Sequence, residues 1–194
     1  MKIIKNNIAN ILTVARLLLL PLIIALFYWE ASLSNDIAKA AIAWISLLIY
    51  AIGAMTDFFD GYIARKLDQI SDFGTFLDPI SDKIYVATIL ILLVAFGRIE
   101  GAWIILVILI FAREFLVSGL REFLGPKNIK VPVSKLAKWK TSVQMLSLGF
   151  LILGSYSPYA TELGLLLLGI ATILTLITGM AYMVIGFKHM KAQD

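Results

Sequence analysis

The sequence predicts an all-α integral membrane protein with six transmembrane helices. Of its 194 residues, 60% are hydrophobic, and long apolar runs recur along the whole chain, whereas a soluble domain of this length would be far more polar. The runs are continuous rather than alternating, which argues against a β-barrel and leaves helices to satisfy the backbone in lipid. The six predicted segments cover residues 8–29, 37–63, 75–97, 102–124, 138–157 and 161–187.

The first three segments carry polar residues within or beside their apolar runs. Segment 8–29 follows a basic start, as in a signal peptide, but Arg16 interrupts the apolar run and no convincing cleavage site follows Trp29. We therefore expect a retained membrane helix. Segment 37–63 ends, and segment 75–97 begins, inside a stretch rich in aspartate.

The last three segments are separated by short connections. GRIEG precedes segment 102–124, GPKNIKVPVSK leads into segment 138–157, and SPYATE precedes segment 161–187. No connection in the chain is long enough to hold a second soluble domain. We therefore expect a single six-helix domain over residues 1–194.

Lysine and arginine predict the orientation of the helices. Of the 17 Lys and Arg residues, 15 fall on one side of the predicted membrane, and only Lys39 and Arg98 fall on the other. Because cytoplasmic loops carry the excess of basic residues, we expect both the N- and C-termini to be cytoplasmic. The aspartate-rich stretch then lies at the cytoplasmic ends of the second and third helices.

The composition excludes several kinds of site. The chain has no cysteine, so it can form neither disulfides nor thiolate metal sites. Its single histidine, His189, lies near the C-terminus, so neither a histidine-based metal site nor a Ser-His-Asp triad is expected. A metal site in this chain would therefore be built from oxygen ligands.

Six aspartates fall between Asp57 and Asp82, and four of them stand at helical spacing. Asp57 and Asp60 are three residues apart, and Asp78 and Asp82 are four apart, so each pair shares one face of its helix. An aspartate in a membrane helix costs about 2.5–3.5 kcal/mol, and four that face one another would also repel. Such a cluster requires positive charge between its carboxylates.

Either basic side chains or metal ions could supply that charge. Arg65, Lys66 and Lys83 are the neighbouring cations. Oxygen ligands without histidine or cysteine favour a hard ion such as Mg²⁺, Mn²⁺ or Ca²⁺, and four carboxylates could hold two of them, as in two-metal phosphoryl-transfer sites. Gly61 and Ala64 keep bulk off the acidic face, where a ligand could approach the backbone.

Single residues of this stretch also have structural interpretations. Asp78 followed by Pro79 could be a helix N-cap with proline at the first helical position. Asp68 and Asp72 could be solvated loop residues, and Gly61 could serve helix packing alone. Four aspartates together at these spacings nevertheless favour a site.

Two parts of this stretch resemble the signature of the CDP-alcohol phosphotransferase family. The signature reads D-x-x-D-G-x-x-A-R, then eight residues, then G-x-x-x-D-x-x-x-D. This chain has DFFDGYIAR from Asp57 and GTFLDPISD from Gly74, and every fixed position matches. The resemblance implies an enzyme that replaces CMP on a CDP-linked substrate with an alcohol acceptor, with two divalent metal ions, Mg²⁺ or Mn²⁺.

The resemblance also implies roles for individual residues. Asp57, Asp60, Asp78 and Asp82 would be the metal ligands, and Asp82 would also be the catalytic base that takes the proton of the acceptor hydroxyl. The implied contacts of the CDP moiety are Gly61, Arg65, Ser71, Gly74, Asn10 and Thr13.

Further stretches resemble the branch of this family that transfers to glycerol 3-phosphate from CDP-diacylglycerol. NILTVAR from Asn10 resembles its N-x-L-T-x-x-R opening, although Ala9 stands where proline is usual. AREFLVSGLR from Ala112 and VSKLAKWKT from Val133 resemble two later segments, although Ala137 replaces a glycine. Other branches would use serine, inositol phosphate or phosphatidylglycerol as acceptor, and the signature does not separate them.

Five basic residues on the predicted cytoplasmic side could bind the phosphate of such an acceptor. An anionic acceptor needs cations for binding and to offset repulsion from the pyrophosphate. The alternative is that these residues reflect topology and attraction to anionic lipid, and Glu114 could simply pair with Arg113 or Arg121. The five residues are Arg113, Arg121, Lys135, Lys138 and Lys140.

A compact chain with cytoplasmic termini fits a bacterial cytoplasmic membrane, with the active site toward the cytoplasm. The resemblance implies a homodimer, and no nucleic-acid partner is expected. Two other classes compete with this interpretation. An intramembrane aspartyl protease would need a G-x-G-D context, which the sequence lacks. A cation transporter would need acidic residues that continue the path through the last two helices, and we find none there beyond Glu162 at the start of the last one.

Overall fold

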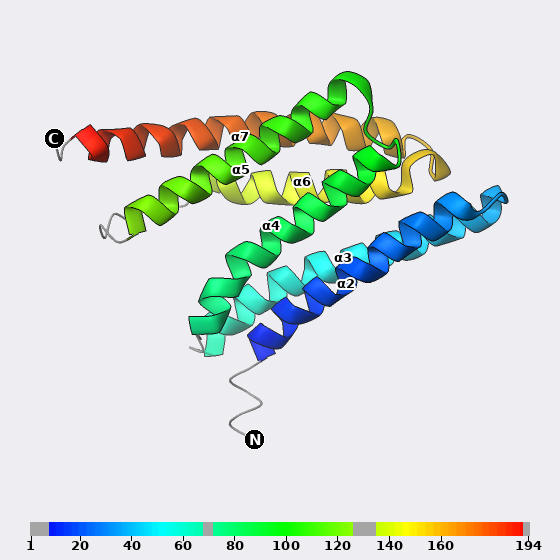
Figure 1. Cartoon of the computed structure of the whole chain (residues 1–194), viewed down its shortest axis with the longest axis horizontal. Helices are drawn as coiled ribbons and strands as arrows, with labels where there is room; N and C mark the ends of the chain where they lie inside the picture. The colour runs from blue at the N-terminus through cyan, green and yellow to red at the C-terminus, as the bar shows by residue number, and fades with distance from the viewer. Residues whose placement is uncertain (1–7, 68–71, 126–134, 192–194) are drawn as a thin grey trace. The chain divides into compact units, whose positions relative to one another are not determined.

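The computed structural model describes residues 8–67, 72–125 and 135–191 (Figure 1). These residues form helices and turns and contain no strand, so the all-α prediction is confirmed, and each predicted segment coincides with one long helix. The helices are α2 (Ile8–Ser32), α3 (Asp36–Leu67), α4 (Asp72–Ala95), α5 (Ile104–Leu124), α6 (Lys135–Leu153) and α7 (Ala160–Lys191), with short 3-10 helices η1 (Gly101–Trp103) and η3 (Gly154–Tyr156).

Four of these helices contain a stretch that is long and apolar enough to cross a membrane. The stretches are Ile11–Ser32, Asp36–Thr56, Gly101–Leu124 and Ala160–Val184. Among the described residues, α4 and α6 do not meet the same standard, since α4 carries charged residues in its first half and α6 begins with several lysines. The chain thus has membrane-type helices, while six crossings and cytoplasmic termini stay predictions.

The start of α4 overturns one interpretation of the aspartate stretch. The helix begins at Asp72, so Asp78 and Pro79 lie inside it rather than at its first turn. Asp78 is therefore not an N-cap, and the interpretation of Asp78 and Pro79 as the start of a helix is wrong. The Ser81 hydroxyl donates a 2.9 Å hydrogen bond to the Asp78 carbonyl within this turn. Asp72 is the first residue of α4, so its interpretation as a loop residue is wrong, and Asp68 lies outside the described residues.

The chain divides into two compact units, each of which is described by itself. The first consists of Met1–Arg98 and Gly149–Thr161, and the second of Ile99–Leu148 and Glu162–Asp194. The expectation of a single domain stays a prediction.

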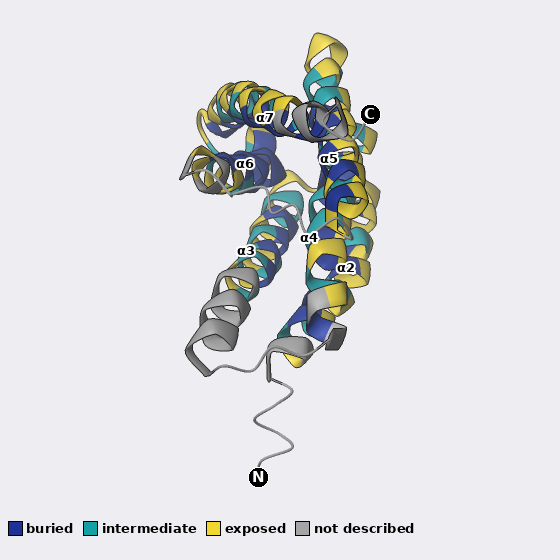
Figure 2. Ribbon diagram, turned by 90° about the vertical axis from the view of Figure 1, so that its left-hand side faces the viewer, coloured by how far each residue is buried: buried dark blue, intermediate teal, exposed yellow. Residues whose placement is uncertain are grey.

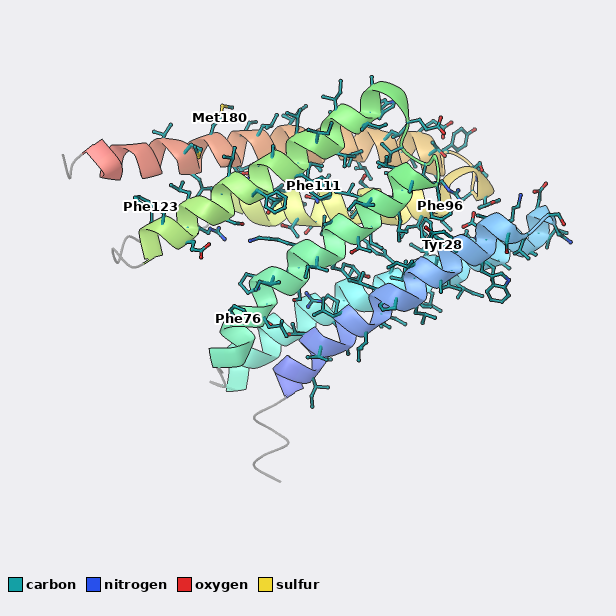
Figure 3. The ribbon with its side chains drawn as sticks, viewed as in Figure 1. Tyr28, Phe76, Phe96, Phe111, Phe123 and Met180 are labelled. Carbon is teal, nitrogen blue, oxygen red and sulfur yellow. The ribbon has the colours of Figure 1, made fainter. Side chains whose placement is uncertain are left out.

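In the first unit, α2 packs against both α3 and α4 (Figure 1). Ile23 and Phe27 on α2 are four residues apart, as are Ile89 and Leu93 on α4, and all four are buried, so each helix turns one apolar face inward (Figure 2). The Phe96 ring lies edge-on to Phe27, and Figure 3 shows Phe96 beside Tyr28, with ring centroids 5.1 Å apart. Aromatic contacts thus connect the C-terminal part of α2 with Phe96, the residue that follows α4.

In the second unit, α5 presents one buried stripe. Its buried residues recur every three or four positions, as the inward face of a helix requires, and they include Arg113 among apolar neighbours. At the C-terminal end of this stripe, Val117, Leu120 and Leu124 form an apolar cluster with Tyr182 of α7. The Ser147 hydroxyl of α6 donates a 2.7 Å hydrogen bond to the Gly164 carbonyl of α7.

Candidate active site

One face of α4 carries Asp78 and Asp82 toward α2. The Thr13 hydroxyl donates a 2.7 Å hydrogen bond to Asp78 Oδ1, and the Arg16 guanidinium forms an ion pair with Asp82. Thr13 and Arg16 are three residues apart, and Asp78 and Asp82 are four apart, so each pair shares one face of its helix. The two contacts therefore lie one helical turn apart between α2 and α4. The prediction that these two aspartates face one side of their helix is confirmed.

The Arg16–Asp82 pair joins a buried cation to an accessible carboxylate. The Arg16 side chain is 2% exposed and that of Asp82 is 46% exposed. A buried guanidinium without an anion would be unfavourable, so Asp82 compensates for its charge. Because nearly half of the Asp82 side chain is accessible, it can still meet a ligand or a substrate.

The other aspartate pair stands on α3. This helix continues without a break through Asp57 and Asp60, so the backbone has the helical spacing that the sequence predicted. Nothing is described of the side chains of Asp57, Asp60 and Arg65, or of the surroundings of Gly61. Among the described residues, no group of three or more His, Cys, Asp or Glu could hold a metal ion, so the four-ligand site stays a prediction.

The two described carboxylates suit a hard divalent cation. Both offer oxygen donors, they stand one turn apart, and both are held by a neighbour on α2. Metal-ligating side chains in proteins are usually held in this way by hydrogen bonds from neighbouring groups. The donor set at Asp78 and Asp82 therefore fits Mg²⁺ or Mn²⁺.

The predicted CDP contacts are only partly described. Gly74 is buried in the first turn of α4, and Thr13 is fully buried with its hydroxyl on Asp78. Asn10 stands in the first turn of α2, but nothing is described of its side chain, and Ser71 lies outside the described residues. The structure thus relates Thr13 to a predicted metal ligand, and its contact with CDP stays a prediction.

Glu114 lies at the centre of a charged network in the second unit. It accepts hydrogen bonds from Arg113 Nη1 at 3.0 Å and from Lys140 Nζ at 2.5 Å. Arg113 also donates from Nε to the Thr175 carbonyl at 3.1 Å and from Nη2 to the Thr178 hydroxyl at 3.2 Å. The predicted pairing of Glu114 with Arg113 is confirmed. Two cations share one carboxylate, so the network keeps a net positive charge that would attract an anion.

Arg121 belongs to the same unit but has a different partner. Its Nη2 donates a 2.9 Å hydrogen bond to the Tyr182 hydroxyl, and its guanidinium carbon lies 5.0 Å from the centroid of that ring. The side chains of Lys135 and Lys138 lie outside the described residues. Three of the five predicted acceptor cations are therefore placed within one unit, and their role stays a prediction.

A third polar cluster lies at the opposite ends of α2 and α4. Arg98 forms an ion pair with Glu30, donates a 3.2 Å hydrogen bond to the Leu153 carbonyl, and stands 4.9 Å from the centroid of the Tyr156 ring. Glu30, Arg98 and Tyr156 line a cavity of about 450 Å³ together with Lys39. The two basic residues predicted on the outer side thus line one cavity. The cluster thus brings together the end of α2, the segment that follows α4, and η3.

Sequence reasoning missed the partners of these charged residues. Arg16 entered it as an interruption of an apolar run and as part of the opening motif, without a partner, and the contact between Glu114 and Lys140 was not foreseen. The available signal was a polar pair, Thr13 and Arg16, at helical spacing inside an apolar segment. Such a pair indicates a buried polar face, but it does not identify the helix that covers it.

Comparison with known proteins agrees with the family resemblance that the sequence motifs indicated. Residues 6–185 match the model of a family described as CDP-alcohol phosphatidyltransferase. Relatives named CDP-diacylglycerol–glycerol-3-phosphate 3-phosphatidyltransferase occur in Rickettsia prowazekii, at 44% identity over 92% of this chain and 94% of the relative, and in Rickettsia typhi, at 45% over 91% and 95%. A relative of the same name in Haemophilus influenzae is 38% identical over 92% of each chain.

Proposed function

This chain belongs to the CDP-alcohol phosphatidyltransferase family, and we propose that it transfers the phosphatidyl group of CDP-diacylglycerol to glycerol 3-phosphate, with release of CMP. The product would be phosphatidylglycerophosphate, so the enzyme would serve phospholipid biosynthesis. The observation that carries this proposal is the near-full-length similarity, at 44% and 45% identity, to relatives whose names state this reaction.

In this proposal, two divalent ions, Mg²⁺ or Mn²⁺, would be held by Asp57, Asp60, Asp78 and Asp82. The charge of such ions would offset the negative charge on the pyrophosphate and on the leaving CMP. The contacts of Asp78 and Asp82 with α2 support this role, because they hold both carboxylates in place before any ligand arrives.

Asp82 would accept the proton of the acceptor hydroxyl. The hydroxyl oxygen attacks the β-phosphorus of CDP-diacylglycerol, the bond from that phosphorus to the CMP oxygen breaks, and CMP leaves with the electron pair. The accessible surface of the Asp82 side chain supports this role, since a general base must be within reach of the hydroxyl. Arg16 would orient the carboxylate.

The CDP moiety would lie against the beginning of α2, the end of α3 and the first turn of α4. We propose that small residues there let the ligand approach the backbone, while a guanidinium and hydroxyl or amide groups bind its polar atoms. The residues are Gly61, Arg65, Ser71, Gly74, Asn10 and Thr13.

The phosphate of glycerol 3-phosphate would be bound by the basic residues of the second unit. The Arg113–Glu114–Lys140 network supports this, because its two cations share one carboxylate. Arg121, Lys135 and Lys138 would add further positive charge. An acceptor without a phosphate would gain no attraction from this positive charge, so the network favours an anionic acceptor.

We further propose that the enzyme is a homodimer in the bacterial cytoplasmic membrane, with the site open to the cytoplasm. The four membrane-type helices support a membrane location. The acyl chains of CDP-diacylglycerol can then stay in the lipid while its head group reaches the aspartates.

The test uses purified full-length protein in detergent, with CDP-diacylglycerol and Mg²⁺. CMP release is measured with glycerol 3-phosphate, serine, inositol phosphate or phosphatidylglycerol as acceptor, and Asp82→Asn and an EDTA-treated sample serve as controls. We expect CMP only with glycerol 3-phosphate, and its loss in both controls. Release with another acceptor would refute the acceptor assignment, and release without any divalent ion would refute the metal assignment.

A further inference from the structure

Tyr85 of α4 reaches the backbone of α3 at a point where α3 has no side chain. Tyr85 is fully buried, and its hydroxyl donates a 2.7 Å hydrogen bond to the Tyr50 carbonyl. The two tyrosine rings are stacked, with centroids 5.7 Å apart. A Cβ at Gly53 would overlap the Tyr85 hydroxyl and lie 2.8 Å from Cζ, closer than real Cβ atoms come. Glycine is thus required for the observed approach.

This contact lies one helical turn from both predicted aspartate pairs. Gly53 precedes Asp57 by four residues on α3, and Tyr85 follows Asp82 by three residues on α4. Residues at these spacings share a helix face. On α4, the same face therefore carries the two carboxylates toward α2 and Tyr85 toward α3.

We propose that Tyr85, seated against Gly53, is the positioning residue that sets the separation and register of α3 and α4, and thereby of the two aspartate pairs that bind divalent cations. The inference rests on the proposed function only in taking those four aspartates as ligands. Tyr85 touches no reacting atom; it acts through the helices that carry the aspartates.

The geometry of the contact explains why it can fix the register more closely than apolar packing alone. Apolar side chains tolerate small shifts of one helix along another, since the hydrophobic effect is not directional. A hydrogen bond from a rigid ring to one carbonyl, with glycine opposite, specifies one separation and one register. Divalent cations need such precision, because Mg²⁺ accepts oxygen ligands only near about 2.0–2.1 Å in octahedral geometry.

The test measures Mn²⁺ binding directly, in full-length protein in detergent without substrate. Free Mn²⁺ is followed by electron paramagnetic resonance for the wild type and for Gly53→Ala, whose added methyl group would displace Tyr85. We expect Gly53→Ala to bind Mn²⁺ about 10-fold to 100-fold more weakly, as when groups that support metal ligands are removed.

Gly186→Ala is the matched control for a general loss of packing. A Cβ at Gly186 would lie 2.5 Å from Leu120 Cδ1, so the substitution adds a comparable clash between α7 and α5, in the second unit. We expect it to lower the Tm in detergent while Mn²⁺ affinity stays within twofold of the wild type. An equal weakening of Mn²⁺ binding in both variants would overturn the proposal.

Two further variants separate the hydrogen bond from the steric fit. Tyr85→Phe keeps the ring and removes the bond to the Tyr50 carbonyl, so we expect weaker Mn²⁺ binding. Gly53→Ala combined with Tyr85→Leu removes the clash, and we expect tighter Mn²⁺ binding than in Gly53→Ala alone, because contacting residues are not additive. If Gly53→Ala does not accumulate, Tyr85→Phe carries the test, and unchanged Mn²⁺ affinity in that variant overturns the proposal.

The result is independent of the acceptor and of catalysis. A wild-type protein that binds Mn²⁺ but releases no CMP would refute the proposed function, while the Mn²⁺ affinities of the variants would still decide the role of Tyr85. A wild type that binds no Mn²⁺ would overturn the positioning proposal directly.

Discussion

Arg16 and Asp82 form an ion pair across 66 residues of sequence, with the cation buried and the carboxylate nearly half exposed. The pair joins α2 to the α4 face that carries the predicted base. We expect Arg16 to hold Asp82 in one orientation, a role for which the sequence offered no partner. Several consequences can be measured.

Arg16→Ala should lower kcat by about 10-fold to 100-fold with a smaller change in KM, because the carboxylate loses its orienting partner. Arg16→Lys should recover part of the rate, since it restores the charge but not the planar fork of the guanidinium. The measurement is steady-state CMP release at saturating Mg²⁺. A rate in Arg16→Ala equal to that of the wild type would show that the ion pair has no part in the reaction.

Thr13→Val should weaken Mn²⁺ binding by about tenfold, whereas Thr13→Ser should bind Mn²⁺ like the wild type. Valine has the shape of threonine but cannot donate the 2.7 Å hydrogen bond to Asp78, while serine can. Mn²⁺ titration followed by electron paramagnetic resonance distinguishes the two. Equal affinity in the valine and serine variants would mean that the hydroxyl does not support the carboxylate.

Glu114→Gln should destabilise the protein, because Arg113 and Lys140 are largely buried and share this one carboxylate. Removing one partner of a buried charge network costs about 3–5 kcal/mol, and each kcal/mol lowers the Tm by about 2–4 °C for a chain of this length. Thermal unfolding in detergent measures the effect.

A double variant provides the control for that network. Lys140→Met combined with Glu114→Gln removes one uncompensated cation and should raise the Tm above that of Glu114→Gln alone. If the double variant is less stable than Glu114→Gln, Lys140 has another anionic partner and the network is wrongly assigned.

Gly154→Ala should lower the Tm more than Gly101→Ala does. Both glycines have positive φ, 52° and 56°, so both substitutions introduce backbone strain of a similar kind. Only at Gly154 would the new Cβ also collide with the Arg98 guanidinium, since nothing lies within 4 Å of the Cβ at Gly101. Differential scanning fluorimetry compares the Tm values of the two variants directly. An equal decrease in Tm would mean that Arg98 can move away from the new Cβ without loss of stability.

Local patterns in the sequence were sufficient for the helices and for the common helix face of Asp78 and Asp82. Continuous apolar runs predicted each of the six long helices within a few residues, because helix formation depends mainly on neighbours along the chain. The spacing of Asp78 and Asp82 predicted their common face for the same reason. The motif around them identified the family, which the full-length similarity confirmed.

The partners of the charged residues could not be predicted from local sequence patterns. Thr13 meets Asp78 across 65 residues, Lys140 meets Glu114 across 26, and the start of α4 at Asp72 made Asp78 an interior residue rather than a cap. The two contacts depend on which helix faces come together and at what register. Helix packing decides that through side-chain shape across the whole unit, as where the absence of a side chain at Gly53 admits Tyr85, and no local pattern in the sequence contains this information.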